Sequence, residues 1–219
     1  MRAKSSHDLH RGSSFRLARR QLVAKKYDGS GLGRATIQGI LELAQTRPAV
    51  AADLPRLAEL VLATWRRAYA GVVPPKFLAD LDVRRIKERW EHHLLVNEFS
   101  IVATVQRDVV GVCSGGAIRE AVGVQTTCGE FYSINIDPRY WRRGLGALLL
   151  SNGITSLQAL GYRDAALWTM ADNRRAKSFY ASQGWFRDGG ERTTSSLTGS
   201  PIHEIRLRRS LLKQRTDSA

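Results

Sequence analysis

The spacing of apolar residues along the chain changes near residue 100. Before that point the apolar residues recur at helical intervals, most clearly from Leu57 to Trp65, and Pro74-Pro75 separates this helix from two further helical segments at 77–81 and 83–95. After it, short runs of residues with high β-propensity alternate with turns. The predicted strands are 101–105, 109–113, 132–136, 165–170, 185–186 and 203–207, with an earlier one in the apolar segment 40–50.

Two more helices are predicted between these strands. One begins near Ala147 and ends at Gly161; the other runs from Asn173 to Gln183, with Asp172 or Asn173 as its cap. A hairpin followed by strands that alternate with helices is typical of an α/β sheet with mixed pairing.

The stretch from Phe131 to Leu150 combines a strand, an arginine-rich loop with Gly144-x-Gly146, and a helix. Glycines in such a loop allow several backbone N–H groups to point at one anion, and the helix N-terminus adds positive charge. A pyrophosphate is the expected ligand. No Lys follows these glycines, which excludes a P-loop, and Leu149 replaces the third glycine of a dinucleotide fingerprint.

The charge of the chain is concentrated at its N-terminus. The formal net charge is +14. Residues 1–47 hold ten Lys/Arg against three Asp/Glu, so half of this net charge lies in about a fifth of the 219 residues. A basic chain attracts anions of every kind, so charge alone does not select a partner. Cys113 and Cys128 lack metal-ligand spacing and are expected to be reduced and buried, as in a cytoplasmic protein without a membrane span.

Two motifs resemble the cofactor motifs of the GNAT acyltransferase superfamily. The first is Ile136-x-Pro138-x-x-Trp141-Arg142-Arg143-Gly144-x-Gly146-Ala147-x-Leu149, and the second is Asn173-x-x-Ala176-x-x-Phe179-Tyr180-x-x-x-Gly184-Trp185. Their order and spacing agree with that family, except that Trp141 stands where the family usually has Gln or Arg. The resemblance implies a mixed, mostly antiparallel β-sheet flanked by helices, with a splayed central strand pair.

The resemblance also implies a cofactor and its contacts. It predicts acetyl-CoA as the donor, with the backbone N–H groups of the loop around its pyrophosphate. The residues of this loop are Arg142, Arg143, Gly144, Leu145, Gly146 and Ala147. The backbone of Ile134 and Ile136 is expected to pair with the pantetheine arm, and Asn173 to contact the cofactor from the second motif. No metal is predicted.

Acetyl transfer to an amine requires a base and a proton donor. Glu130 is the candidate base, with water as the alternative, since some members of the family carry a glutamate at the end of this strand. Tyr180 is the candidate acid for the departing thiolate, and a backbone N–H near Ile134 to Ile136 is the candidate donor to the oxyanion. Trp65 and Tyr69 are predicted to wall the acceptor site.

We therefore expect three segments: a basic extension over 1–45, an acyl-CoA-dependent N-acyltransferase domain over 46–210, and a tail over 211–219. The predicted function is acetyl transfer to a primary amine of a small molecule or peptide, and the resemblance allows a homodimer. The alternative is a degenerate scaffold of the same fold whose basic extension binds nucleic acid, because a fold does not guarantee an activity.

Overall fold

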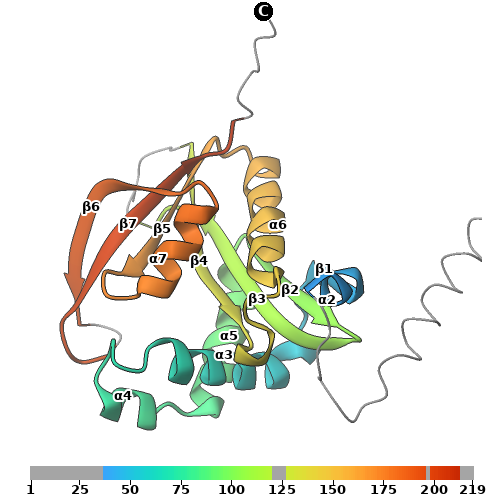
Figure 1. The fold of residues 1–219 in the computed structure, drawn as a ribbon, viewed down its shortest axis with the longest axis horizontal. Helices are drawn as coiled ribbons and strands as arrows, with labels where there is room; N and C mark the ends of the chain where they lie inside the picture. The colour runs from blue at the N-terminus through green and yellow to red at the C-terminus, as the bar shows by residue number, and fades with distance from the viewer. Residues whose placement is uncertain (1–36, 120–126, 196–197, 213–219) are drawn as a thin grey trace, which may run out of the picture. The chain divides into compact units, whose positions relative to one another are not determined.

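The computed structural model describes residues 37–119, 127–195 and 198–212. Its seven-stranded sheet has the order β1-β2-β3-β4-β5-β7-β6 (Figure 1). The strands are β1 (Ala44–Pro48), β2 (Phe99–Val105), β3 (Asp108–Ala117), β4 (Cys128–Ile136), β5 (Asp164–Met170), β6 (Phe186–Thr194) and β7 (Ile202–Ser210). The helices are α2 (Ile37–Leu43), α3 (Leu54–Ala68), α4 (Pro75–Ala79), α5 (Val83–Val96), α6 (Leu145–Ala159) and α7 (Arg174–Ser182), with short 3-10 turns η1 (Ala51–Asp53) and η2 (Pro138–Tyr140).

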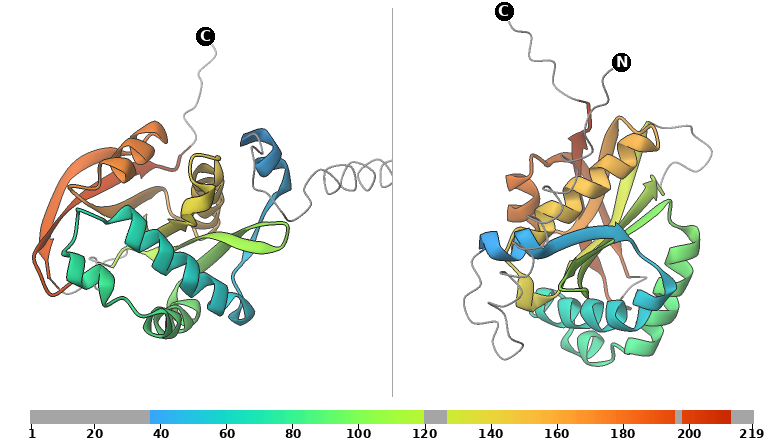
Figure 2. Two further views of the ribbon diagram at one scale, coloured as in Figure 1. Left: turned by 60° about the horizontal axis from the view of Figure 1, so that its bottom comes forward. Right: turned by 90° about the vertical axis from the view of Figure 1, so that its right-hand side faces the viewer.

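Helices cover both faces of this sheet (Figures 1 and 2). On one face Val112 of β3 belongs to the core formed with α3 and α5. On the other, the neighbouring Cys113 directs its thiol at the carbonyl of Leu149 in α6. Because successive residues of a strand point to opposite faces, β3 is buried on both sides. Its apolar sequence is consistent with this double burial.

The central pair of strands separates part of the way along. β4 and β5 are the one parallel pair described, and their pairing runs only from Cys128 to Phe131 of β4. β4 continues to Ile136, five residues past the last pair. The predicted fold class, a mixed and mostly antiparallel sheet with a splayed central pair, is therefore confirmed.

Two predicted elements differ in the structure. The segment predicted as one strand over 40–50 is helix α2 followed by the shorter strand β1. Ile37, Ile40 and Leu41 have i, i+3, i+4 spacing, which favours a helix. β6 is nine residues long, whereas only Trp185-Phe186 was predicted. Its residues are mainly polar, so apolar patterning gives no signal; antiparallel pairing with β7 holds the strand.

The predicted extension over 1–45 falls mostly outside the described residues, as does most of the tail over 211–219. α2 and the start of β1 precede residue 46, and the domain boundaries stay a prediction. None of the described helices is both long and apolar enough to cross a bilayer.

Candidate active site

The glycine loop between η2 and α6 has the backbone of an anion site. Arg142 has φ +59° and Gly144 has φ +80°, so left-handed residues lie on both sides of Arg143. Such alternation turns successive N–H groups toward one side of the chain. α6 follows directly, and its first ladder bond runs from the Leu148 N–H to the Gly144 carbonyl. The N–H groups of Leu145, Gly146 and Ala147 precede that bond and point out of the helix end.

One buried atom of the half-buried Arg143 supports the same interpretation. The Nη1 atom of Arg143 is buried and has no hydrogen-bond partner among the described residues. A buried donor without a partner is costly, which points to an anion as its partner. Arg143 belongs to the loop, so this nitrogen is a candidate donor to a pyrophosphate bound there.

The two glycines of the loop are needed for different reasons. Gly144 adopts a backbone that L side chains disfavour, and a Cβ there would lie 2.8 Å from Leu41 Cδ1 of α2. At Gly146 a Cβ would meet the Phe179 ring at 3.2 Å. Phe179 precedes Tyr180 on α7, so Gly146 sets how closely the two helices with cofactor motifs approach.

We expect Gly144→Ala to weaken acetyl-CoA binding by about tenfold, because a strained residue displaces the loop N–H groups. Isothermal titration calorimetry measures this. Gly161→Ala is the matched control: Gly161 has φ +91° with open space around it, at the far end of α6. It should lower the melting temperature similarly and leave the affinity unchanged. Equal affinity loss in both variants would contradict a role for the Gly144 backbone.

The β4 edge that faces the splay presents the backbone of Ile134 and Ile136. The Asp137 N–H donates to the Val110 carbonyl at 2.9 Å, and Ile136 lies opposite Gly111. Ile136 and Gly111 therefore form a non-hydrogen-bonded pair of the antiparallel ladder. The N–H and C=O groups of Ile136, and those of Ile134 two residues earlier, point away from β3. Both residues therefore present backbone donors where the predicted pantetheine contacts lie.

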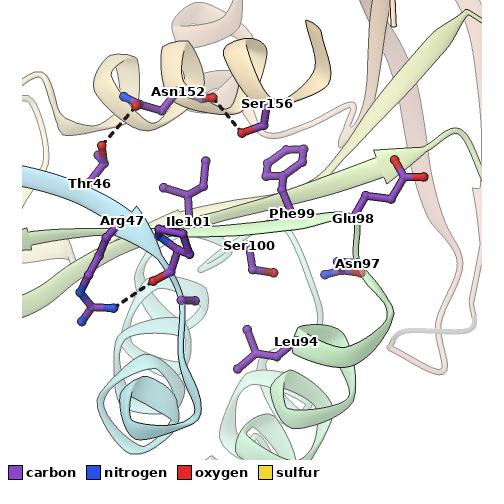
Figure 3. Close-up of a pocket in the computed structure, with 12 residues that line it drawn as sticks. Thr46, Arg47, Leu94, Asn97, Glu98, Phe99, Ser100, Ile101, Asn152 and Ser156 are labelled. Atoms are coloured by element: carbon purple, nitrogen blue, oxygen red, sulfur yellow. Dashed lines mark hydrogen bonds between the residues drawn. The ribbon is translucent and has the colours of Figure 1, made fainter. Parts of the chain in front are cut away.

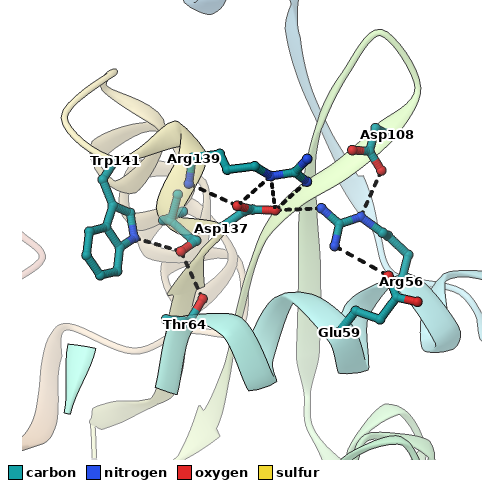
Figure 4. Close-up of polar contacts among 8 residues, drawn as sticks. Arg56, Glu59, Thr64, Asp108, Asp137, Arg139 and Trp141 are labelled. Carbon is teal, nitrogen blue, oxygen red and sulfur yellow. Dashed lines mark hydrogen bonds and ion pairs between the residues drawn. The ribbon is translucent and has the colours of Figure 1, made fainter. Parts of the chain in front are cut away.

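The carbonyl of Ile136 is already engaged. It accepts from Thr64 Oγ1 at 2.9 Å and from Trp141 Nε1 at 2.7 Å (Figure 4). These two bonds fill both lone pairs of the oxygen, which leaves the Ile136 N–H as its available backbone group. The sequence noted Trp141 only as a departure from the family pattern; here its indole ties the loop to the strand end, while Arg175 of α7 stacks 3.9 Å over its ring.

A buried carboxylate fixes the turn between β4 and the loop (Figure 4). Asp137 is 3% exposed and accepts from Arg56 Nη2 at 2.6 Å and from Arg139 Nη2 at 2.8 Å. Burial alone would raise the pKa of Asp137, but the hydrogen bonds from Arg139 and Arg56 outweigh it and lower this pKa to about 2. Sequence reasoning missed this network, because Arg56 and Asp137 are 81 residues apart.

Tyr180 lies on α7, with its ring 5.1 Å from Phe179 and 6.0 Å from Trp185 between centroids. Burial raises the pKa of its phenol, and Tyr69 and Cys113 raise it further. Of these two groups, Cys113 is paired with Ile134 of β4 in the sheet. A phenol with a raised pKa keeps its proton at neutral pH, as an acid requires.

Glu130 is held by an arginine. Its side chain is 1% exposed, so Glu130 is not a solvent-exposed carboxylate at the strand end. The Arg119 backbone N–H donates to Oε2 at 3.0 Å, and the guanidinium donates to Oε1 through Nε and Nη2. A substrate amine can reach this carboxylate only if Arg119 moves.

The remaining predicted residues fall into two groups. Asn173 is 8% exposed and its Oδ1 caps α7 by accepting from the Ala176 N–H at 3.0 Å, which leaves its amide NH₂ for a ligand. Trp65 and Tyr69 pack edge to face at 4.8 Å. Trp65 also packs on the α3–α5 core, whereas Tyr69 packs against Met170 of β5. Of the two, Tyr69 is the one that influences the pKa of Tyr180.

A cavity of about 430 Å³ lies elsewhere, at the edge where β1 ends beside β2 (Figure 3). None of the predicted site residues lines it. The polar side chains of α6 that line it form hydrogen bonds within the protein. Asn152 Oδ1 accepts from Thr46 Oγ1 of β1, and the Asn152 carbonyl accepts from Ser156 Oγ. On the opposite wall Asn97 and Ser100 point toward one another (Figure 3). The cavity is therefore separate from the candidate active site.

Neither Cys113 nor Cys128 forms a disulfide and both are buried, as predicted, and burial raises the pKa of the Cys113 thiol to about 12. This leaves Cys113 protonated and unreactive. Among the residues described, no group of three or more His, Cys, Asp or Glu side chains is arranged to hold a metal ion.

Comparison with known proteins identifies this arrangement. Residues 55–185 match the model of the acetyltransferase (GNAT) family. The chain belongs to the GNAT family. Over 128 residues it is 27% identical to the uncharacterized N-acetyltransferase YuaI of Bacillus subtilis (strain 168), across 58% of this chain and 72% of that protein. It is therefore an acetyl-CoA-dependent acetyltransferase.

Solved GNAT structures share the fold. The PaiA N-acetyltransferase from Thermoplasma acidophilum, in complex with coenzyme A, superimposes with a TM-score of 0.58 at 17% identity, over 76% of this chain and 98% of that one. YncA from Salmonella typhimurium, with acetyl-CoA, gives 0.59 at 19% identity, over 81% and 99%. At these identities the likeness establishes the fold alone.

Proposed function

We propose that this GNAT enzyme acetylates a primary amine by direct attack in a ternary complex, with Tyr180 as proton donor. The observation that carries the proposal is the half-buried Tyr180 on α7, whose pKa is raised by desolvation, so that the phenol keeps its proton at neutral pH. Two other features of the site support it: the anion-binding loop, and the backbone N–H groups of Ile134 and Ile136, which point away from β3.

Acetyl-CoA supplies a thioester carbonyl carbon for the amine to attack. The neutral nitrogen forms the new C–N bond, the C–S bond breaks, the amine releases one proton, and the sulfur takes one. Within this scheme the loop of Arg142 to Ala147 binds the pyrophosphate, and the amide of Asn173 contacts the cofactor. The N–H of Ile134 or Ile136 donates to the carbonyl oxygen as negative charge develops there. Tyr180 gives its proton to the departing sulfur.

The proton of the acceptor ammonium leaves through water, with Glu130 in a positioning role. Both oxygens of Glu130 accept from Arg119, and this pair fixes the chain where it leaves β3. The nucleic-acid alternative rested on the basic extension, which lies largely outside the described residues, and no comparison favours it.

We expect Glu130→Gln to keep the acid limb of the kcat/KM–pH profile at its wild-type position, with activity reduced through the loss of the Arg119 ion pair. Measuring initial rates of thiol release from pH 5 to pH 9 in both proteins tests this. Loss or displacement of the acid limb in the variant would instead establish Glu130 as the base.

The function itself is tested by an amine-panel screen with acetyl-CoA that reads free thiol and confirms the acetylated product by mass spectrometry. Transfer to at least one primary amine, abolished when acetyl-CoA is replaced by coenzyme A, is the expected result. Thiol release at the same rate with and without amine would contradict the proposal, since it would be hydrolysis.

A further inference from the structure

Asn135 of β4 carries a side-chain amide that is almost buried and has no partner. The residue is 7% exposed, and among the residues that the structure describes its side-chain oxygen and nitrogen make no hydrogen bond. Neither atom is completely enclosed by protein, so a ligand can reach them. Buried polar groups are nearly always hydrogen-bonded, because an unpaired one is costly. An unpaired amide at this place therefore points to a ligand as its partner.

The side chain of Asn135 projects from the face of the sheet that α3 covers. Asn135 lies directly opposite Val112 of β3, and Val112 packs in the core with α3 and α5. Residues directly opposite in a ladder share a face. α3 is also bonded to this end of β4, since Thr64 Oγ1 donates to the carbonyl of Ile136 at 2.9 Å. Asn135 is therefore on the α3 side of the strand that separates from β5.

α3 joins the ends of the two strands that separate. Thr64 is bonded to the end of β4, and Tyr69, five residues further along the helix, packs in a cluster with Met170, the last residue of β5. Trp65, which packs edge to face with Tyr69, lies between these two contacts. The two residues predicted to wall the acceptor site are thus on the same helix, and on the same side of the sheet, as the Asn135 amide.

The two neighbours of Asn135 on β4 carry the backbone donors that the proposed function uses. The N–H groups of Ile134 and Ile136 point away from β3 in the plane of the sheet, whereas side chains leave that plane. Successive residues of a strand are only about 3.3 Å apart. A thioester oxygen held by either N–H group therefore has its carbonyl carbon within reach of an amine held by the Asn135 side chain.

We propose that Asn135 binds the acceptor: its Oδ1 accepts one N–H of the attacking primary amine and directs the nitrogen at the thioester carbon. This deepens the proposed function and rests on it. The amide takes no proton, so the proton of the acceptor still leaves through water. Because the amide is neutral, it holds the amine without favouring the ammonium form by charge, as a carboxylate would.

Asn135→Leu is the first test, because leucine has nearly the shape of asparagine and lacks its polar atoms. We expect kcat/KM for the acceptor to fall by about tenfold, the loss of one hydrogen bond to the amine, and the dissociation constant of acetyl-CoA to stay within about twofold. The melting temperature should stay the same or rise, since an unpaired amide beside an apolar core is replaced by an apolar side chain.

Asn97→Leu is the matched control. The Nδ2 atom of Asn97 is also buried and without a partner, but Asn97 lines the separate cavity beside β2, so this variant should keep the wild-type kcat/KM. An unchanged kcat/KM in Asn135→Leu would overturn the proposal. A lower melting temperature together with weaker acetyl-CoA binding in Asn135→Leu would also overturn it, because Asn135 would then serve the fold.

Asn135→Asp tests the role of the oxygen separately from that of the NH₂ group. A carboxyl group keeps an acceptor oxygen at the same place and lacks the NH₂ donors. Calorimetry on coenzyme A-saturated protein measures the dissociation constant of the best acceptor in the panel. Asn135→Asp should bind this amine at least as tightly as wild type, and Asn135→Leu about tenfold more weakly. Equal weakening in both variants would assign the contact to the NH₂ group and overturn the proposal.

The same binding series separates this proposal from the proposed function. If no amine in the panel is acetylated, the proposed function fails, and n-butylamine becomes the probe for coenzyme A-saturated protein. Binding that is weakened in Asn135→Leu and kept in Asn135→Asp and Asn97→Leu supports amine recognition by Asn135 independently of activity. Equal binding by wild type and all three variants, or none by wild type, overturns it.

Discussion

Tyr180→Phe is expected to lower kcat by about 100-fold or more at saturating acetyl-CoA and acceptor, the range typical of a lost general acid. The substitution removes one oxygen and keeps the ring, which packs against Phe179 and Trp185. KM for both substrates and the melting temperature should therefore change little. Steady-state kinetics with the best acceptor of the panel, together with thermal unfolding, measures these effects.

Tyr162→Phe is the matched control for this experiment. Its hydroxyl is hydrogen-bonded to Glu98 at 3.0 Å, so the same chemical change is made at a tyrosine outside the proposed machinery, and kcat should stay at the wild-type value. Because burial raises the pKa of Tyr180, the wild-type rate should also show no loss from phenol ionisation below about pH 10. A Tyr180→Phe enzyme within about twofold of wild type would eliminate the acid role.

Asp137→Ala is expected to lower the free energy of unfolding by about 2–4 kcal/mol, since it leaves Arg56 and Arg139 without the buried carboxylate that both bind. The same change frees the turn before the glycine loop, so KM for acetyl-CoA should rise. Urea titration measures the stability. Asp80→Ala removes the exposed Lys76–Asp80 pair on α4 and should leave the midpoint unchanged.

The pH dependence gives a second test of the Asp137 network. The carboxylate has a lowered pKa in the folded protein, so its contribution to stability is present above the pKa of an unfolded aspartate, near 4, and is lost as the pH falls through about 2. Wild type should therefore lose about 2 kcal/mol more stability than Asp137→Ala between pH 5 and pH 2. Parallel stability curves for the two proteins would contradict this role.

The sequence by itself determined the fold and the cofactor loop, because both depend on local pattern. Strand alternation, helical spacing and Gly144-x-Gly146 each act over a few residues, and the two motifs placed the family. Because these patterns are local, they did not predict most of β6 or the start of β1. The polar strand β6 has no apolar period to reveal it, and the start of β1 was obscured by the apolar residues that instead form α2.

Only the tertiary structure decided which polar groups meet across the sheet. Glu130 accepts a hydrogen bond from Arg119, which follows β3. Asp137 accepts one from Arg56 of α3. The carbonyl of Ile136 accepts one from Thr64, also of α3. The ladders likewise place Trp168 of β5 opposite Arg206 of β7, and Arg192 of β6 opposite Glu204 of β7. Such contacts join residues between 11 and 81 positions apart. The free energy that selects them comes from burial and pairing in the folded chain, which local sequence does not encode.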